Sequence, residues 1–81
     1  MRLHPHAIAR MQERGATEAE VEAAIRDGER FPAKFGRQGF RRNLNFNENW
    51  RGQHYATKQI EAIAIYEDGD WLVISVIVKY F

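Results

Sequence analysis

Three basic side chains near the beginning of the chain have the types and the spacing of a phosphate site. His6, Arg10 and Arg14 follow one another at intervals of four residues, so they share one side of a helix. An imidazole titrates near neutral pH and can carry a proton, and guanidinium groups neutralise phosphate charge. This row therefore predicts binding of a phosphate, or chemistry on one. The plainer alternative is that Arg10 pairs with Glu13 and that His6 is an ordinary surface residue.

Cleavage of RNA by its own 2′-hydroxyl is the reaction that suits such groups, because it needs proton carriers and cations but no metal ion. We expect His6 to remove or return the proton while Arg10 and Arg14 hold the phosphate. His54 or Tyr55 is the candidate for a second proton carrier. Together these residues predict a metal-independent RNA endonuclease.

Binding of nucleic acid or protein without catalysis is the alternative from a different class. The bases of single-stranded RNA stack on aromatic side chains, and the phosphates follow basic ones. The aromatic candidates are Trp50, Tyr55, Tyr66 and Trp71. We expect Trp50 to be the most exposed of them, because polar residues surround it, whereas core packing is the plainer interpretation for most of the others.

The composition limits the chain to one small domain, residues 1–81, with a single core. It has no cysteine, and its three histidines lack the spacing and the neighbouring carboxylates of a metal site, so we expect no metal. No glycine-rich phosphate loop indicates a nucleotide cofactor. No apolar run approaches the roughly 20 residues of a membrane span. We expect a cytoplasmic protein that is a monomer or a small homo-oligomer.

Basic residues concentrate in the middle third of the chain. The net charge is only +1, but positions 30–58 contain seven Lys or Arg residues and one Glu. Such an asymmetry favours a polyanionic partner, although a solvated basic surface is the plainer alternative. Besides Arg14, the residues expected to contact phosphate are Arg41, Arg42, Lys58 and Lys79.

Two helices are predicted in the first third of the chain. Pro5 suits a first helical position and Gly15 a left-handed cap, so the first helix should run from Pro5 to Arg14, after a cap at His4. Thr17-Glu18-Ala19-Glu20 is a capping box, and the second helix should end at Asp27-Gly28. Each helix has a single apolar stripe, so both should pack on a sheet.

The remainder is expected to form strands. Their ranges are about Arg30 to Phe35, Phe40 to Phe46, Lys58 to Tyr66 and Trp71 to Phe81, with a polar loop from Asn47 to Gly52. This α-α-β-β-β-β order predicts an α+β domain, with both helices on one face of a three- or four-stranded antiparallel sheet.

Asp68-Gly69 indicates a two-residue hairpin turn, which fixes a register. Tyr66 should then face Trp71, and Lys58 should face Lys79. The helices are expected on the face with the larger aliphatic side chains: Ile63, Ile65, Leu72, Ile74, Val76 and Val78. The other face should be open and basic, with Arg41, Asn43 and Asn45 joining the two lysines around small residues such as Ala62, Ala64 and Ser75.

The pattern His-x-x-x-Arg-x-x-x-Arg-Gly from His6 to Gly15, followed by the capped second helix, resembles the opening of small bacterial domains similar to the RelE/ParE/BrnT toxin superfamily. The resemblance implies a RelE-like fold, ribonuclease activity on RNA that is free or on the ribosome, and an antitoxin partner. It also implies that His6, Arg10 and Arg14 belong to the site. The strand that usually precedes the helices is missing here or reduced to Met1 to Leu3, and other members of the superfamily inhibit gyrase or lack catalysis.

Overall fold

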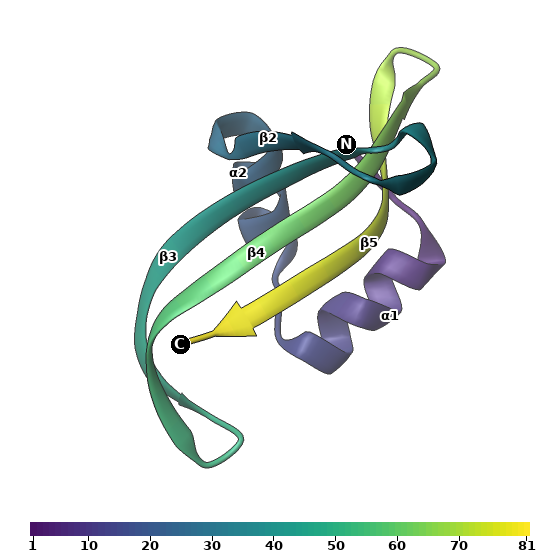
Figure 1. Cartoon of the computed structure of the whole chain (residues 1–81). Helices are drawn as coiled ribbons and strands as arrows, with labels where there is room; N and C mark the ends of the chain where they lie inside the picture. The colour runs from purple at the N-terminus through teal and green to yellow at the C-terminus, as the bar shows by residue number, and fades with distance from the viewer.

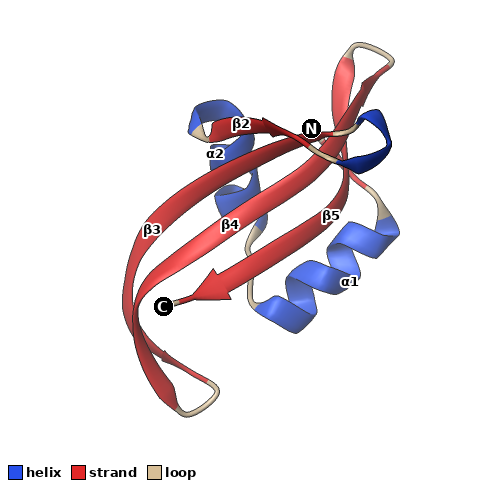
Figure 2. Cartoon of the chain, in the orientation of Figure 1, coloured by secondary structure: helices blue, strands red, loops and turns tan.

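Two helices and five strands form the chain in the computed structural model, which covers residues 1–81 (Figure 2). In chain order the elements are β1 (Arg2–Leu3), α1 (Pro5–Arg14), α2 (Glu18–Asp27), β2 (Glu29–Pro32), the 3-10 turn η1 (Lys34–Gly36), β3 (Gln38–Trp50), β4 (Gln53–Glu67) and β5 (Asp70–Tyr80). The α+β class and the pair of N-terminal helices are confirmed.

The sheet has the strand order β1-β5-β4-β3-β2. Its neighbouring strands are antiparallel, except that β1 pairs with β5 in the parallel direction. The sheet is therefore five-stranded and mixed, and the prediction of three or four antiparallel strands was wrong. Because β1 pairs only Arg2 with Leu72 and Leu3 with Val73, it is too short to leave an alternating pattern in the sequence.

Capping residues close in sequence set the ends of both helices, as predicted. The His4 imidazole accepts a hydrogen bond from the His6 backbone N–H at 3.0 Å, and Gly15 caps α1 with φ 77°. Both bonds of the capping box between Thr17 and Glu20 are present at the start of α2. Each helix thus begins and ends where its own side chains satisfy the terminal backbone groups.

The core lies between the helices and one face of the sheet, and Figure 1 shows both helices behind the sheet. In β4 that face carries Ile60, Ala62 and Ala64, which are fully buried, whereas Ile65 is exposed on the other side. The prediction that the helices cover the Ile63 and Ile65 face was therefore wrong. Small alanines let a helix approach the sheet closely, so side-chain size was a poor guide to the covered face.

A β-bulge in β5 changes the predicted register. The Asp68-Gly69 turn and the Tyr66–Trp71 pair are confirmed, but Ala64 pairs with Val73 and Ile63 with Ser75, so Ile74 has no partner. One extra residue reverses the faces of everything beyond it. Lys58 consequently faces Tyr80 and Lys79 faces Gln59, and the predicted pair of Lys58 with Lys79 was wrong.

The hairpin of β3 and β4 is longer than expected and bends round toward the helices (Figure 1). The expected polar loop is strand as far as Trp50, and only Arg51 and Gly52 form the turn, with φ 51° and 82°. A turn with two positive φ values matches the twist of a hairpin. This long hairpin carries its tip to the end of α1.

Candidate functional site

Three side chains, two from strands and one from the turn between β3 and β4, converge on the last carbonyls of α1. Arg51 donates to the Glu13 carbonyl at 2.7 Å, Tyr80 donates its hydroxyl to that of Arg14 at 2.7 Å, and Lys58 donates to that of Gly15 at 2.6 Å. The final carbonyls of a helix have no partners within it and form the negative end of its dipole. Two cations and a hydroxyl therefore stabilise this end of α1 and attach it to the β3–β4 hairpin and to β5.

Aromatic rings stack next to the residues that donate these hydrogen bonds. The Trp50 and Tyr80 rings lie 5.1 Å apart and 15° from parallel, and the Arg51 guanidinium lies 5.1 Å from the centre of the Trp50 ring. Trp50 also passes so close to Gly15 that a Cβ there would lie 2.7 Å from its Cη2 atom. Glycine at position 15 is thus required both by its positive φ and by the indole beside it.

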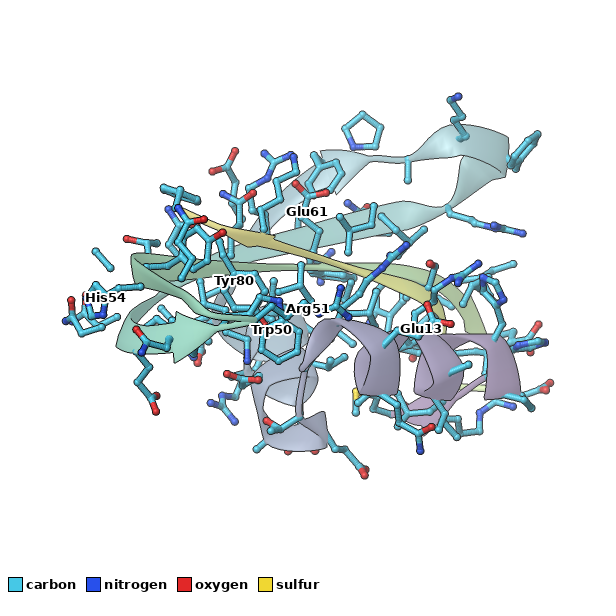
Figure 3. The ribbon with its side chains drawn as sticks, turned by 90° about the horizontal axis from the view of Figure 1, so that it is seen from below. Glu13, Trp50, Arg51, His54, Glu61 and Tyr80 are labelled. Carbon is cyan, nitrogen blue, oxygen red and sulfur yellow. The ribbon has the colours of Figure 1, made fainter.

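A pocket of about 280 Å³ opens at this junction, and we call it the α1-end pocket. Its lining residues are Glu13, Arg14, Trp50, Arg51, Val78 and Tyr80. Figure 3 shows Trp50, Arg51 and Tyr80 close together beside the end of α1, with Glu13 on α1 to their right.

The charges of the α1-end pocket favour an anion. Arg14 is fixed by a 2.7 Å hydrogen bond to the Val76 carbonyl, and Arg51 by its bond to Glu13. Each guanidinium has five N–H donors, so each keeps donors for a ligand. The one carboxylate in the lining, that of Glu13, is paired with Arg10 at 2.8 Å. The pocket therefore offers two cations, but no imidazole, to a bound group.

Tyr80 remains a hydrogen-bond donor in this setting. Burial raises the pKa of its hydroxyl above the ordinary value of 10.0, and the Glu20 carboxylate raises it further, while Arg51 opposes them. Burial and a nearby negative charge both disfavour the phenolate. The hydroxyl is therefore neutral at physiological pH and suits a positioning role rather than that of a base.

The predicted histidines do not reach the α1-end pocket. His6 is exposed in the first turn of α1, and Arg14 follows it by eight residues, about 12 Å along the axis at 1.5 Å per residue. His54 is exposed near the hairpin tip and lies well to the side of the pocket group in Figure 3. The structure thus places neither proposed proton carrier, His6 or His54, in the pocket beside Arg14.

The other predicted phosphate contacts lie on two different faces. Lys58 is only 5% exposed on the helix side, where it also pairs with Glu20 at 2.9 Å, and Arg42 is half-buried on the same side. Arg41 lies on the open face, 2.9 Å from the Glu61 carboxylate, and Lys79 lies 3.5 Å from the same group. These four residues do not form one basic surface.

Of the two aromatic residues that line the pocket, Trp50 was a candidate from the sequence and Tyr80 was not. Trp50, expected to be exposed, is half-buried against Tyr80, and Tyr55 lies 5.6 Å from the same ring. Trp71 packs in the core against Phe40 at 5.0 Å. The one local signal was Gly15, because a glycine that ends a helix also permits close approach of another side chain.

No group of three or more His, Cys, Asp or Glu side chains is placed to hold a metal ion. Neither helix is long or apolar enough to cross a membrane. No family model matches the chain, and no curated protein and no solved structure was found to resemble it.

Proposed function

We propose that this chain binds single-stranded RNA, with a phosphate in the α1-end pocket. The observation that carries the proposal is that Arg14 and Arg51, from elements far apart in sequence, line one pocket beside a stacked indole. Guanidinium groups bind phosphate through paired donors, and both a guanidinium plane and an aromatic ring accept a stacked base. Because the pocket contains no imidazole, binding without cleavage is favoured over acid–base catalysis there.

RNA affinity and its salt dependence test this proposal. Fluorescence anisotropy of a labelled single-stranded oligonucleotide is measured against the wild type, Arg51→Gln and the control Arg26→Gln, an exposed residue on α2. Loss of one phosphate contact should weaken binding about tenfold and reduce the slope of log K against log salt by about 0.7. Equal effects of the two substitutions would show that only diffuse positive charge matters, and would reject the pocket as the site.

A single-tryptophan variant reports on the same pocket directly. The chain has two tryptophans, and Trp71 packs against the core, so Trp71→Phe leaves Trp50, in contact with Tyr80 and Arg51, as the only indole. Bound RNA is expected to quench its emission, and the quenching should titrate with the affinity measured by anisotropy. Binding without any change in Trp50 emission would place the RNA elsewhere.

A second candidate is a toxin-type, metal-independent RNA endonuclease with a RelE-like fold. The observation that favours it is that the His6 imidazole is exposed on α1, one turn before Arg10, at the spacing on which the superfamily resemblance rests. In this proposal RNA extends from the α1-end pocket along α1 to His6, which moves the proton. An antitoxin protein would be its partner, and the RNA would be free or on the ribosome.

Cleavage in the presence of EDTA distinguishes the two candidates. Wild type, His6→Ala and His54→Ala are incubated with RNA and with translating ribosomes, and the products are analysed for 2′,3′-cyclic phosphate ends. The endonuclease proposal expects such ends from the wild type and their loss, by about 100-fold or more in rate, from His6→Ala. Cleavage that survives in His6→Ala would remove His6 from the mechanism, and binding without cleavage in either assay would leave the first proposal standing.

A further inference from the structure

The sheet face turned away from the helices carries a second concave surface. The β2 and η1 segment lies above this face, on the side opposite to the helices, and Glu61 lies between that segment and the sheet (Figure 3). The cavity beneath has a volume of about 360 Å³, and we call it the open-face groove. The apolar part of its lining includes Phe31, Ala33, Phe35, Ile63 and Ile77. Ile65, which is 36% exposed, belongs to the same face of β4 as Ile63.

Phe35 beside this groove is exposed and conformationally strained. Its side chain is 85% exposed, and its backbone has φ 61° and ψ 34°, in the left-handed region. A bulky side chain is disfavoured there, whereas Gly36 beside it adopts φ 70° without penalty. Burial within the chain does not compensate for this strain, since Phe35 is 85% exposed. An apolar ring held out at some cost indicates a contact with another molecule.

The rim of the open-face groove is positively charged. Lys34 and Arg37 line it, and the Arg37 guanidinium lies 5.6 Å from the centre of the Phe35 ring. Glu61 is the one carboxylate in the lining, and it is already paired with Arg41 and Lys79. The groove therefore combines an apolar floor with unpaired cations at its edge.

We propose that the open-face groove docks a segment of a partner protein that combines apolar side chains with carboxylates. The apolar side chains would cover Phe35 and the isoleucines, and the carboxylates would pair with Lys34 and Arg37. A second copy of this chain fits less well, because a two-fold contact through this face would bring the same cations together. RNA also fits less well, because the floor carries aliphatic groups where nucleic-acid sites carry donors and cations.

Synthetic peptides of defined composition test the docking surface. One labelled pool is built from Leu, Phe, Asp, Glu and Ser; a second has Lys in place of every acid, and a third has Ser in place of every apolar residue. Binding to the wild type is followed by anisotropy, and the contacted residues are mapped by amide chemical shifts. The acidic and apolar pool should bind at least about tenfold more tightly than either of the others, with shifts at Ile63 and Ile77.

Four variants decide whether the groove is the site. Phe35→Gly removes the ring at a position whose φ glycine adopts freely, so the variant should fold, and Arg37→Glu reverses a rim charge. Each should weaken peptide binding about tenfold. The controls are Tyr66→Ser, an exposed ring outside the groove, and Arg26→Glu on α2, and both should bind as the wild type does.

Several results would contradict the proposed docking of an acidic and apolar segment. If the acidic and apolar pool binds no better than the other pools, or if Phe35→Gly and Arg37→Glu bind as well as their controls, the docking surface is rejected. Displacement of the peptides by RNA would assign the groove to nucleic acid instead. Sedimentation that shows dimers of the wild type, and monomers of Phe35→Gly, would assign it to a second copy of the chain.

Discussion

At the scale of single residues, the glycines with positive φ fall into two kinds. Gly52 in the hairpin turn has φ 82° and no atom within 4 Å of where a Cβ would stand. Gly15 has φ 77°, but a Cβ there would meet Trp50 at 2.7 Å and the Tyr80 hydroxyl at 2.8 Å. The first glycine serves the backbone alone, whereas the second also lets the hairpin contact the end of α1.

Alanine substitutions separate these two requirements. Gly52→Ala should lower the free energy of unfolding by about 1 kcal/mol, the cost of a left-handed conformation for a residue with a Cβ. Gly15→Ala should lower it by about 2–4 kcal/mol, because displacement of Trp50 adds to that cost. Urea denaturation followed by tryptophan emission measures both. Equal losses would show that Trp50 is not packed against Gly15 in solution.

At the scale of elements, the parts that could be predicted are those with local causes. The bounds of α1 and α2 follow from Pro5, Gly15 and the Thr17 capping box, whose bonds all lie within a few residues. The Asp68-Gly69 turn is local in the same sense. The arrangement of the strands depends on distant parts of the chain. The bulge at Ile74 decides which residues of β5 face the helices, and no residue near Ile74 indicates from the sequence that it is unpaired.

The same reasoning explains which site residues were foreseen. Arg14 was singled out by its spacing from His6 and Arg10, which is a property of one helix. Trp50 and Arg51 reach the end of α1 because the long β3–β4 hairpin bends toward it, and Tyr80 reaches it from the end of β5. Lys58 was predicted to face phosphate, but the helices cover its face of β4, so its partners are Glu20 and Gly15, and the bulge in β5 gives it Tyr80 as a neighbour.

Lys58 should consequently matter for folding rather than for ligand affinity. Lys58→Met removes a 5% exposed cation from the Gly15 carbonyl and from Glu20, and should lower the free energy of unfolding by about 2–3 kcal/mol. Lys79→Met is the matched control: its ammonium is exposed and 3.5 Å from Glu61, so the loss should stay below about 0.5 kcal/mol. Chemical denaturation measures both variants. Similar losses would contradict the structural role given to Lys58.

At the scale of the whole molecule, β5 separates the two proposed surfaces. Val78 and Tyr80 point to the helix side and line the α1-end pocket, whereas Ser75 and Ile77 point to the open face and line the open-face groove. Neighbouring residues of one strand thus serve opposite sides of the sheet. Three of the seven cations of the middle third line these surfaces, with Arg51 at the pocket and Lys34 and Arg37 at the groove.

If both proposals hold, the two surfaces should bind their ligands independently. Arg51→Gln should weaken RNA binding and leave the acidic and apolar peptides unaffected, and Arg37→Glu should do the reverse. Long-range charge effects should be small at physiological ionic strength, where charges are screened over about 8 Å. For each ligand, the change in binding free energy of the double variant should then equal the sum of the changes in the two single variants, within about 0.5 kcal/mol. Sites without shared partners behave additively in this way. Anisotropy titrations of each ligand, with and without saturating amounts of the other, measure this directly. Competition between RNA and peptide would mean that they bind one shared surface. The two faces of the sheet would then not carry separate binding functions.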